Sequence, residues 1–140
     1  MREAQTFTIK DFDKELKVKV TPMPATKAES FIYRLLLALD FKGVANDVQN
    51  VTPEAIVTMV NGLDYETAKP LLDELLRCCV LVTEGGMEMA LTPEKVDATI
   101  SDPTTLMTLR LKSAKVNFGF FLTGGYQNFL SNLRGSPNVD

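Results

Sequence analysis

The spacing of apolar residues first changes along this chain at Pro22 and Pro24. Before the prolines, in residues 5–9 and 14–20, apolar and polar side chains alternate, which is the period of a β-strand with one buried face. After them, apolar residues recur at steps of three and four, as on an amphipathic helix. The pattern predicts a two-stranded hairpin with one solvent-exposed face, followed by a helix over about 26–41.

Helix-start signals predict the later helices. Two of them, Thr52-Pro53-Glu54 and Thr92-Pro93-Glu94, combine an N-cap, a proline at the first helical position and an acid near the positive end of the dipole. Asp64 and Asp102-Pro103 start two more helices, the first ending near residue 79 and the second covering 103–122. Residues 26–29 have the spacing of a capping box, with Thr26 as the expected N-cap.

The role of one proline stays undecided, and a second pair of strands is predicted to be short. Pro70 lies in the second turn of the helix that starts at Asp64, so it either kinks that helix or marks its true start. Residues 80–83 indicate a short strand, and residues 87–91 indicate its return strand after a glycine turn.

These elements predict an α+β fold, with a small N-terminal β-hairpin followed by a mainly helical body of four to six helices. The length of 140 residues is that of one domain. We expect residues 1–125 to form a single α+β domain and residues 126–140 to form a flexible C-terminal tail.

Composition excludes several kinds of function. Fifteen basic and eighteen acidic residues give a net charge of −3, which argues against general nucleic-acid binding. The chain has no histidine, so Ser-His-Asp catalysis and zinc sites that need an imidazole are excluded. Its longest wholly apolar run, residues 35–39, is far shorter than the ~20 residues that span a bilayer, and we expect a cytosolic protein that does not contact membranes.

No catalytic, metal-binding or cofactor-binding constellation is recognisable. Cys78 and Cys79 are neighbours, and we expect two reduced thiols with a structural role. Paired carboxylates occur on segments where solvated charge is the plain expectation. We therefore predict a protein that is not an enzyme and holds no cofactor; a small enzyme that uses carboxylates is the alternative from another class.

The aromatic residues near the C-terminus are the candidate binding site. Within twelve residues the chain carries Phe118, Phe120, Phe121, Tyr126 and Phe129. A single helix face can bury about half of them, because Phe120 and Phe121 are adjacent and point in different directions. Either the end of this helix is buried on more than one side, or some of these rings form a docking surface for a partner.

Three stretches of the chain resemble the tail assembly chaperones of long-tailed bacteriophages and related prophages. The first follows the hairpin and reads Met23-Pro24-Ala25-Thr26-Lys27-Ala28-Glu29. The second runs from Asp64 to Leu76, with Ala68, then Pro70-Leu71-Leu72-Asp73-Glu74, and is followed by Cys78. The third contains Thr105-Leu106 and Leu109-Arg110 and ends in Asn117-Phe118-Gly119-Phe120-Phe121.

The resemblance implies a non-enzymatic protein of the host bacterial cytoplasm that is not expected in the mature virion. It would bind the phage tape measure protein, a long helical protein, and keep it soluble. It would also help to recruit the tail tube protein, and a longer product made by translational frameshift is implied as well. The alternative is a structural phage tail or head–tail connector subunit. The oligomeric state stays open.

Overall fold

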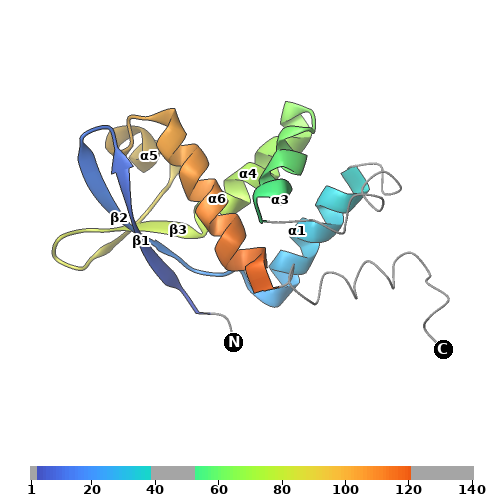
Figure 1. Cartoon of the computed structure of the whole chain (residues 1–140), viewed down its shortest axis with the longest axis horizontal. Helices are drawn as coiled ribbons and strands as arrows, with labels where there is room; N and C mark the ends of the chain where they lie inside the picture. Colours follow the sequence, from blue (N-terminus) through green and yellow to red (C-terminus); the bar gives the residue numbers. More distant parts are fainter. Residues whose placement is uncertain (1–2, 39–52, 121–140) are drawn as a thin grey trace.

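The computed structural model describes residues 3–38 and 53–120, in which each of two pairs of strands is followed by helices (Figure 1). In chain order they are β1 (Gln5–Asp11), β2 (Lys14–Val20), α1 (Ala25–Ala38), α3 (Pro53–Asn61), α4 (Tyr65–Arg77), β3 (Cys79–Val82), β4 (Glu88–Ala90), α5 (Pro93–Thr99) and α6 (Pro103–Phe120). The predicted α+β class, with an N-terminal hairpin followed by helices, is confirmed.

The four strands form one antiparallel sheet in the order β1-β2-β3-β4. Val18 on β2 lies opposite Phe7 on one side and Leu81 on the other, so their side chains share the buried face of the sheet. The periodicity predicts both hairpins. It does not predict that they join through β2 and β3, because pairing between strands distant in the chain leaves no local pattern.

The buried residues form two apolar clusters. The helical cluster consists of Met23, Phe31, Ile32, Leu35, Leu36, Ile56, Val60, Ala68, Leu71, Leu75, Ala114 and Phe118. The sheet cluster consists of Ile9, Val18, Val20, Leu76, Cys79, Leu81, Leu91, Val96, Ile100, Leu109 and Val116. Burial of these side chains supplies the main driving force for the fold.

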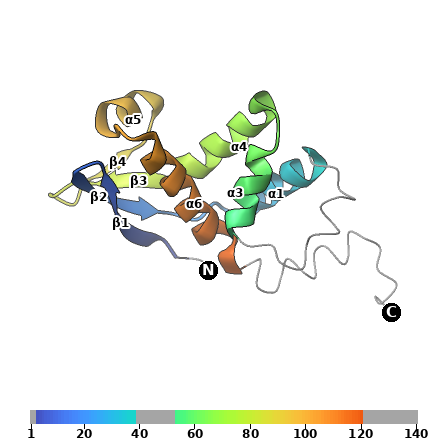
Figure 2. The ribbon, with the colours of Figure 1, turned by 45° about the horizontal axis from the view of Figure 1, so that its top comes forward.

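Helix α6 belongs to both clusters. It lies between the sheet on one side and α3 and α4 on the other (Figures 1 and 2). Ala114 and Phe118, one turn apart, face the helical cluster, whereas Leu109 and Val116, two turns apart, face the sheet cluster. A helix that is buried on two sides therefore connects the two halves of the fold.

Two predicted N-caps are confirmed and one is wrong, and the predicted N-cap Thr52 lies outside the described residues. The Asp64 carboxylate accepts from the backbone N–H of Thr67 at 3.3 Å, and the Thr92 hydroxyl accepts from that of Lys95 at 3.4 Å. Helix α1 begins at Ala25 rather than after Thr26, because the Pro24 carbonyl accepts the first backbone hydrogen bonds of the helix. The capping-box spacing at residues 26–29 therefore lies inside the helix.

The helix ends also differ slightly from the predictions. Pro70 lies inside α4, which begins at Tyr65, so this proline does not mark the start of the helix. Helix α4 ends at Arg77 instead of near residue 79, since Cys79 already pairs in β3. The predicted ends of the helices at 41 and 122, and the predicted tail at 126–140, lie outside the described residues.

Candidate functional site

The structure describes only part of the predicted aromatic surface. Phe118 is 2% exposed, and its ring centroid lies 5.1 Å from that of Phe31 in the helical cluster. This position makes Phe118 a core residue of the fold. Phe120 ends α6 but its side chain is not among the described ones, and Phe121, Tyr126 and Phe129 lie outside the described residues. A docking role for these four aromatics stays a prediction.

Asn117 is a fully buried polar residue that joins three parts of the chain. Its Oδ1 accepts from the backbone N–H of Met23 at 2.6 Å, and its Nδ2 donates to the Ser113 carbonyl at 2.9 Å and to the Cys78 Sγ at 3.5 Å. The contacts tie α6 to the connection before α1 and to the end of α4. Because a buried amide without partners is costly, this set of bonds fixes a single arrangement of these segments.

Asp11 is a second buried polar residue, and sequence reasoning missed its role. Its carboxylate accepts from the backbone N–H groups of Ser101 at 3.0 Å and Asp102 at 2.8 Å, and from the Thr105 hydroxyl at 3.2 Å. These hydrogen bonds, led by that of Ser101, lower the pKa of Asp11 below its ordinary value despite its burial. Asp11 ends β1 and lies far from α5 and α6 in the chain, so it gives no local signal of this contact.

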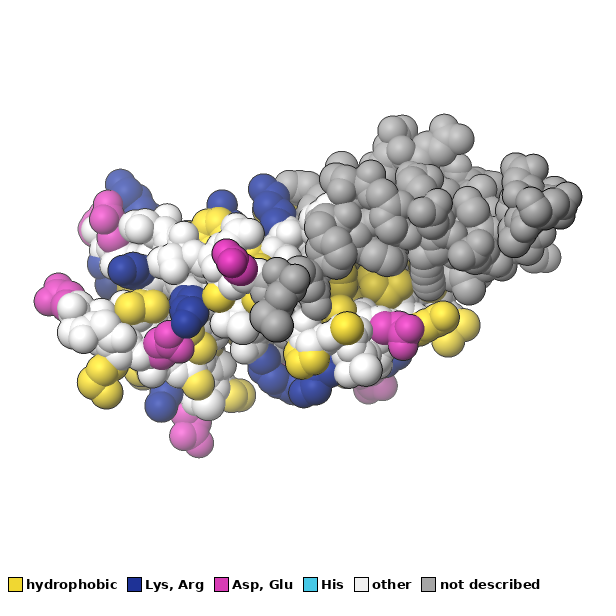
Figure 3. All heavy atoms as spheres, turned by 90° about the horizontal axis from the view of Figure 1, so that it is seen from below, with side chains coloured by type: hydrophobic (Ala, Val, Ile, Leu, Met, Phe, Trp, Pro, Cys, Tyr) yellow, Lys and Arg dark blue, Asp and Glu magenta, His cyan; other side chains and the backbone are white. Residues whose placement is uncertain are grey.

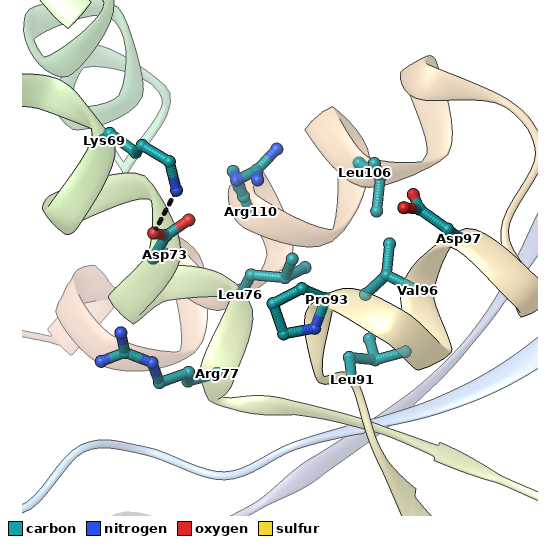
Figure 4. A pocket seen from close by; sticks show the side chains of 10 residues that line it. All are labelled: Lys69, Asp73, Leu76, Arg77, Leu91, Pro93, Val96, Asp97, Leu106 and Arg110. Carbon is teal, nitrogen blue, oxygen red and sulfur yellow. Dashed lines mark hydrogen bonds and ion pairs between the residues drawn. The ribbon is translucent and has the colours of Figure 1, made fainter. Parts of the chain in front are cut away.

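A cleft between α4, α5 and α6 is the candidate binding site among the described residues. It has a volume of about 300 Å³, and apolar atoms make up most of its surface (Figure 4). The residues that line it are Lys69, Asp73, Leu76, Arg77, Leu91, Pro93, Val96, Asp97, Leu106 and Arg110. Sequence reasoning did not find this site, because its lining comes from three helices and from Leu91 before α5, which only the tertiary fold brings together.

The floor of the cleft is apolar. Leu76 on α4 and Val96 on α5 are buried members of the sheet cluster, and Leu106 on α6 is half-buried beside them. Figure 4 shows these side chains converging with Pro93, at the start of α5. The cleft is therefore an opening onto the edge of the core, where a further apolar side chain can be removed from water.

Charged side chains surround this floor. The Lys69 Nζ lies 2.8 Å from the Asp73 carboxylate, whose hydrogen bond raises the pKa of Lys69. The Arg110 Nε donates to the Leu72 carbonyl at 3.2 Å, next to this pair. Asp97 lies on the other side of the cleft, beside Leu106 (Figure 4). With Arg77, the lining holds three cations and two anions.

The rest of the visible surface is mixed. Figure 3 shows charged side chains of both signs interspersed with small apolar patches over the described part of one face. No set of three or more histidine, cysteine, aspartate or glutamate residues in ranges 3–38 and 53–120 is placed to hold a metal ion. In the same ranges, no helix is both long and apolar enough to span a bilayer.

The two cysteines are free in the structure. Cys79 is buried below the end of α4, and its burial, with a smaller contribution from neighbouring Cys78, raises the pKa of its thiol to about 12. A thiol that stays protonated is a poor nucleophile. Cys79 therefore packs as an apolar residue, in agreement with the structural role predicted for the pair.

Comparison with known proteins finds one family. A model of the family described as "Phage tail assembly chaperone protein, TAC" matches residues 14–130 of the 140. The match runs from the start of β2 to beyond the end of α6 and includes the whole cleft. Searches of the curated proteins and of the solved structures return no match.

Proposed function

The chain belongs to the phage tail assembly chaperone family, and we propose that it binds the tape measure protein, assists assembly of the tail tube and catalyses no reaction. The match over residues 14–130 is the observation that carries this proposal. The proposed action takes place in the cytoplasm of the host bacterium, and the protein is absent from the mature virion. We propose the tail tube protein as a second binding partner.

The geometry is compatible with a protein that holds a helical partner. Helix recognition requires a groove with an apolar floor and a polar rim, and the cleft between α4, α5 and α6 has both. The aromatics Phe120, Phe121, Tyr126 and Phe129 are the second proposed contact surface. A net charge of −3 favours solubility of a protein that exposes such surfaces.

The buried polar groups support the non-enzymatic part of the proposal. The Asp11 carboxylate is occupied by hydrogen bonds from Ser101, Asp102 and Thr105, and it holds the β1–β2 turn against the start of α6. The Asn117 amide holds three segments together, and the Cys79 thiol stays protonated. Each of these groups has a structural role in the fold.

Co-expression tests the proposal directly. The tape measure protein of the same phage would be produced alone and together with this chain, and its soluble fraction would be measured after lysis. We expect the tape measure protein to aggregate alone and to be soluble, and co-purify with the chain, when both are present. Unchanged solubility and no co-purification would contradict the proposal.

Purified phage particles provide the second measurement, because the alternative is a structural tail or head–tail connector subunit. A chaperone is absent from mass spectra of the particles, whereas a structural subunit is present in a fixed ratio to other tail proteins. Detection in such a ratio would replace the chaperone proposal by the structural one.

A further inference from the structure

We propose that the cleft between α4, α5 and α6 binds an amphipathic helix of the partner through one large apolar side chain, with a carboxylate of the same helix on the Arg110 side of it. This inference rests on the proposed function, because it takes the partner to be the tape measure protein. It adds the place of contact and the chemistry by which the partner segment is recognised.

The size of the cleft sets what can enter it. Its volume is about 300 Å³. A helix about 10 Å wide would contact the elements around the cleft, so it lies across the opening and one of its side chains enters. Leu76, Val96 and Leu106 offer that side chain an apolar environment.

The charges on the rim decide which helix fits. On the α4–α6 side, Lys69 and Asp73 neutralise each other at 2.8 Å, and Arg110 lies beside them (Figure 4). The Nε of Arg110 donates to the Leu72 carbonyl, while in the described part of the chain its terminal nitrogens make no hydrogen bond. Arg77 of α4 also lines this side, so the α4–α6 side has two surplus positive charges, and Arg110 has donors available to a carboxylate.

The opposite side of the cleft has the opposite charge. Asp97 on α5 lies beside Leu106, and within ranges 3–38 and 53–120 it forms no ion pair. A partner carboxylate is therefore attracted toward Arg110 and repelled from Asp97. This polarity orients the partner helix, with an acid on the Arg110 side of the apolar anchor and a neutral or basic residue on the Asp97 side.

The first test uses two neighbouring residues of α6. Leu106 lines the cleft, whereas Met107 is 65% exposed outside its lining. Overlapping peptides that cover the tape measure protein are the probes, and binding to the full chain is measured by fluorescence anisotropy. We expect Leu106→Arg to weaken binding of the captured peptides by about tenfold or more, and Met107→Arg to leave it unchanged within about twofold.

The second test uses charge reversal. We expect Arg110→Glu to weaken binding about tenfold, and a peptide whose acidic residue next to the apolar anchor is replaced by lysine to restore it. Restored binding shows that the variant is folded. Lys95→Glu is the matched control, because Lys95 is an exposed cation of α5 outside the lining of the cleft. Thermal unfolding of each variant confirms that the domain is intact.

The outcomes separate the two proposals. If the unaltered chain captures neither the tape measure protein nor its peptides, the proposed function fails. If it captures them and a folded Leu106→Arg variant binds equally well, the function stands and the cleft is not the contact site. If Leu106→Arg instead abolishes self-association in sedimentation experiments without changing peptide binding, the cleft is an interface between copies of this chain, and the inference is overturned.

Discussion

At the scale of single residues, the polar groups with the largest structural effect are buried ones whose partners are distant in the chain. Asp11 and Asn117 are 1% and 0% exposed, and each joins segments that are not adjacent in sequence. Asp11 is the last residue of β1, before the turn at residues 12–13. An acid at the end of a strand does not indicate which backbone N–H groups its carboxylate will accept from. Such contacts become visible only in the folded chain.

The lowered pKa of Asp11 allows a prediction of how the stability of the protein depends on pH. Its folded-state pKa is lowered from the ordinary value of 3.8, so the carboxylate contributes stability above about that pH. The contribution is lost as the pH falls through the lowered pKa. We expect Asp11→Asn to lower the melting temperature at neutral pH and to reduce the loss of stability between about pH 4 and pH 2. Melting curves across this range, with Asp13→Asn as control, measure both effects.

The backbone conformation of Phe12 indicates a substitution that should stabilise the protein. It has a φ of +55° in the turn between β1 and β2, a conformation that is unfavourable for a bulky residue, and it is 63% exposed. We expect Phe12→Gly to raise the free energy of unfolding by about 0.5–1 kcal/mol, because glycine adopts this φ without strain. Phe12→Ala keeps the strain and is the control. A loss of stability in Phe12→Gly, measured by urea denaturation, would show that the ring contributes more than the strain costs.

At the scale of elements, the predicted types hold and the boundaries move by a few residues. The period of the apolar residues identifies both hairpins and the helices, because the side chains that alternate or recur are those that pack into the two clusters. The prediction placed the start of α1 too late. The first hydrogen bonds of this helix go to the backbone carbonyl of Pro24, and every residue type has such a carbonyl, so the sequence does not indicate it. Pro70 remains inside α4, where the surrounding packing of Leu71 and Leu75 outweighs one missing hydrogen bond.

We expect alanine substitutions of the aromatic residues in and after the last turn of α6 to have different effects, some on stability and some on binding. Phe118 is buried against Phe31, so we expect Phe118→Ala to lower the free energy of unfolding by about 3–5 kcal/mol. We expect Phe120→Ala and Phe129→Ala to leave the fold intact and to weaken binding of the tape measure protein. Urea denaturation and co-purification distinguish the two effects. Loss of folding in the Phe120 and Phe129 variants would assign those rings to the core and remove the docking proposal for them.

At the scale of the whole molecule, α6 connects the two apolar clusters. Leu109 of the sheet cluster and Phe118 of the helical cluster lie on the same helix, and the Asn117 amide anchors that helix to the connection between β2 and α1. If one cluster is disrupted, α6 is no longer held in place, and its packing in the other cluster is disrupted as well. The described part of the chain is therefore expected to unfold in a single transition.

Leu109 tests this coupling. It is fully buried, so we expect Leu109→Ala to lower stability by about 2–5 kcal/mol. Because α6 is shared, amide hydrogen exchange should accelerate equally in β2 and in α1, although only β2 belongs to the sheet cluster. Val82→Ala, on the half-buried outer face of β3, is the control with a much smaller expected effect. Acceleration confined to the strands would show that the two clusters open independently.

The sequence alone determined the fold class, the types of the described elements and the family resemblance that the match over residues 14–130 confirms. These properties follow from local periodicity, helix-start chemistry and the order of short motifs, all of which are written in neighbouring residues. Tertiary structure decided the union of the two hairpins in one sheet, the burial of Phe118, the Asp11 and Asn117 contacts and the cleft between α4, α5 and α6. Each of these joins residues that are distant along the chain, and the position of one relative to another is set by the packing of all the elements between them.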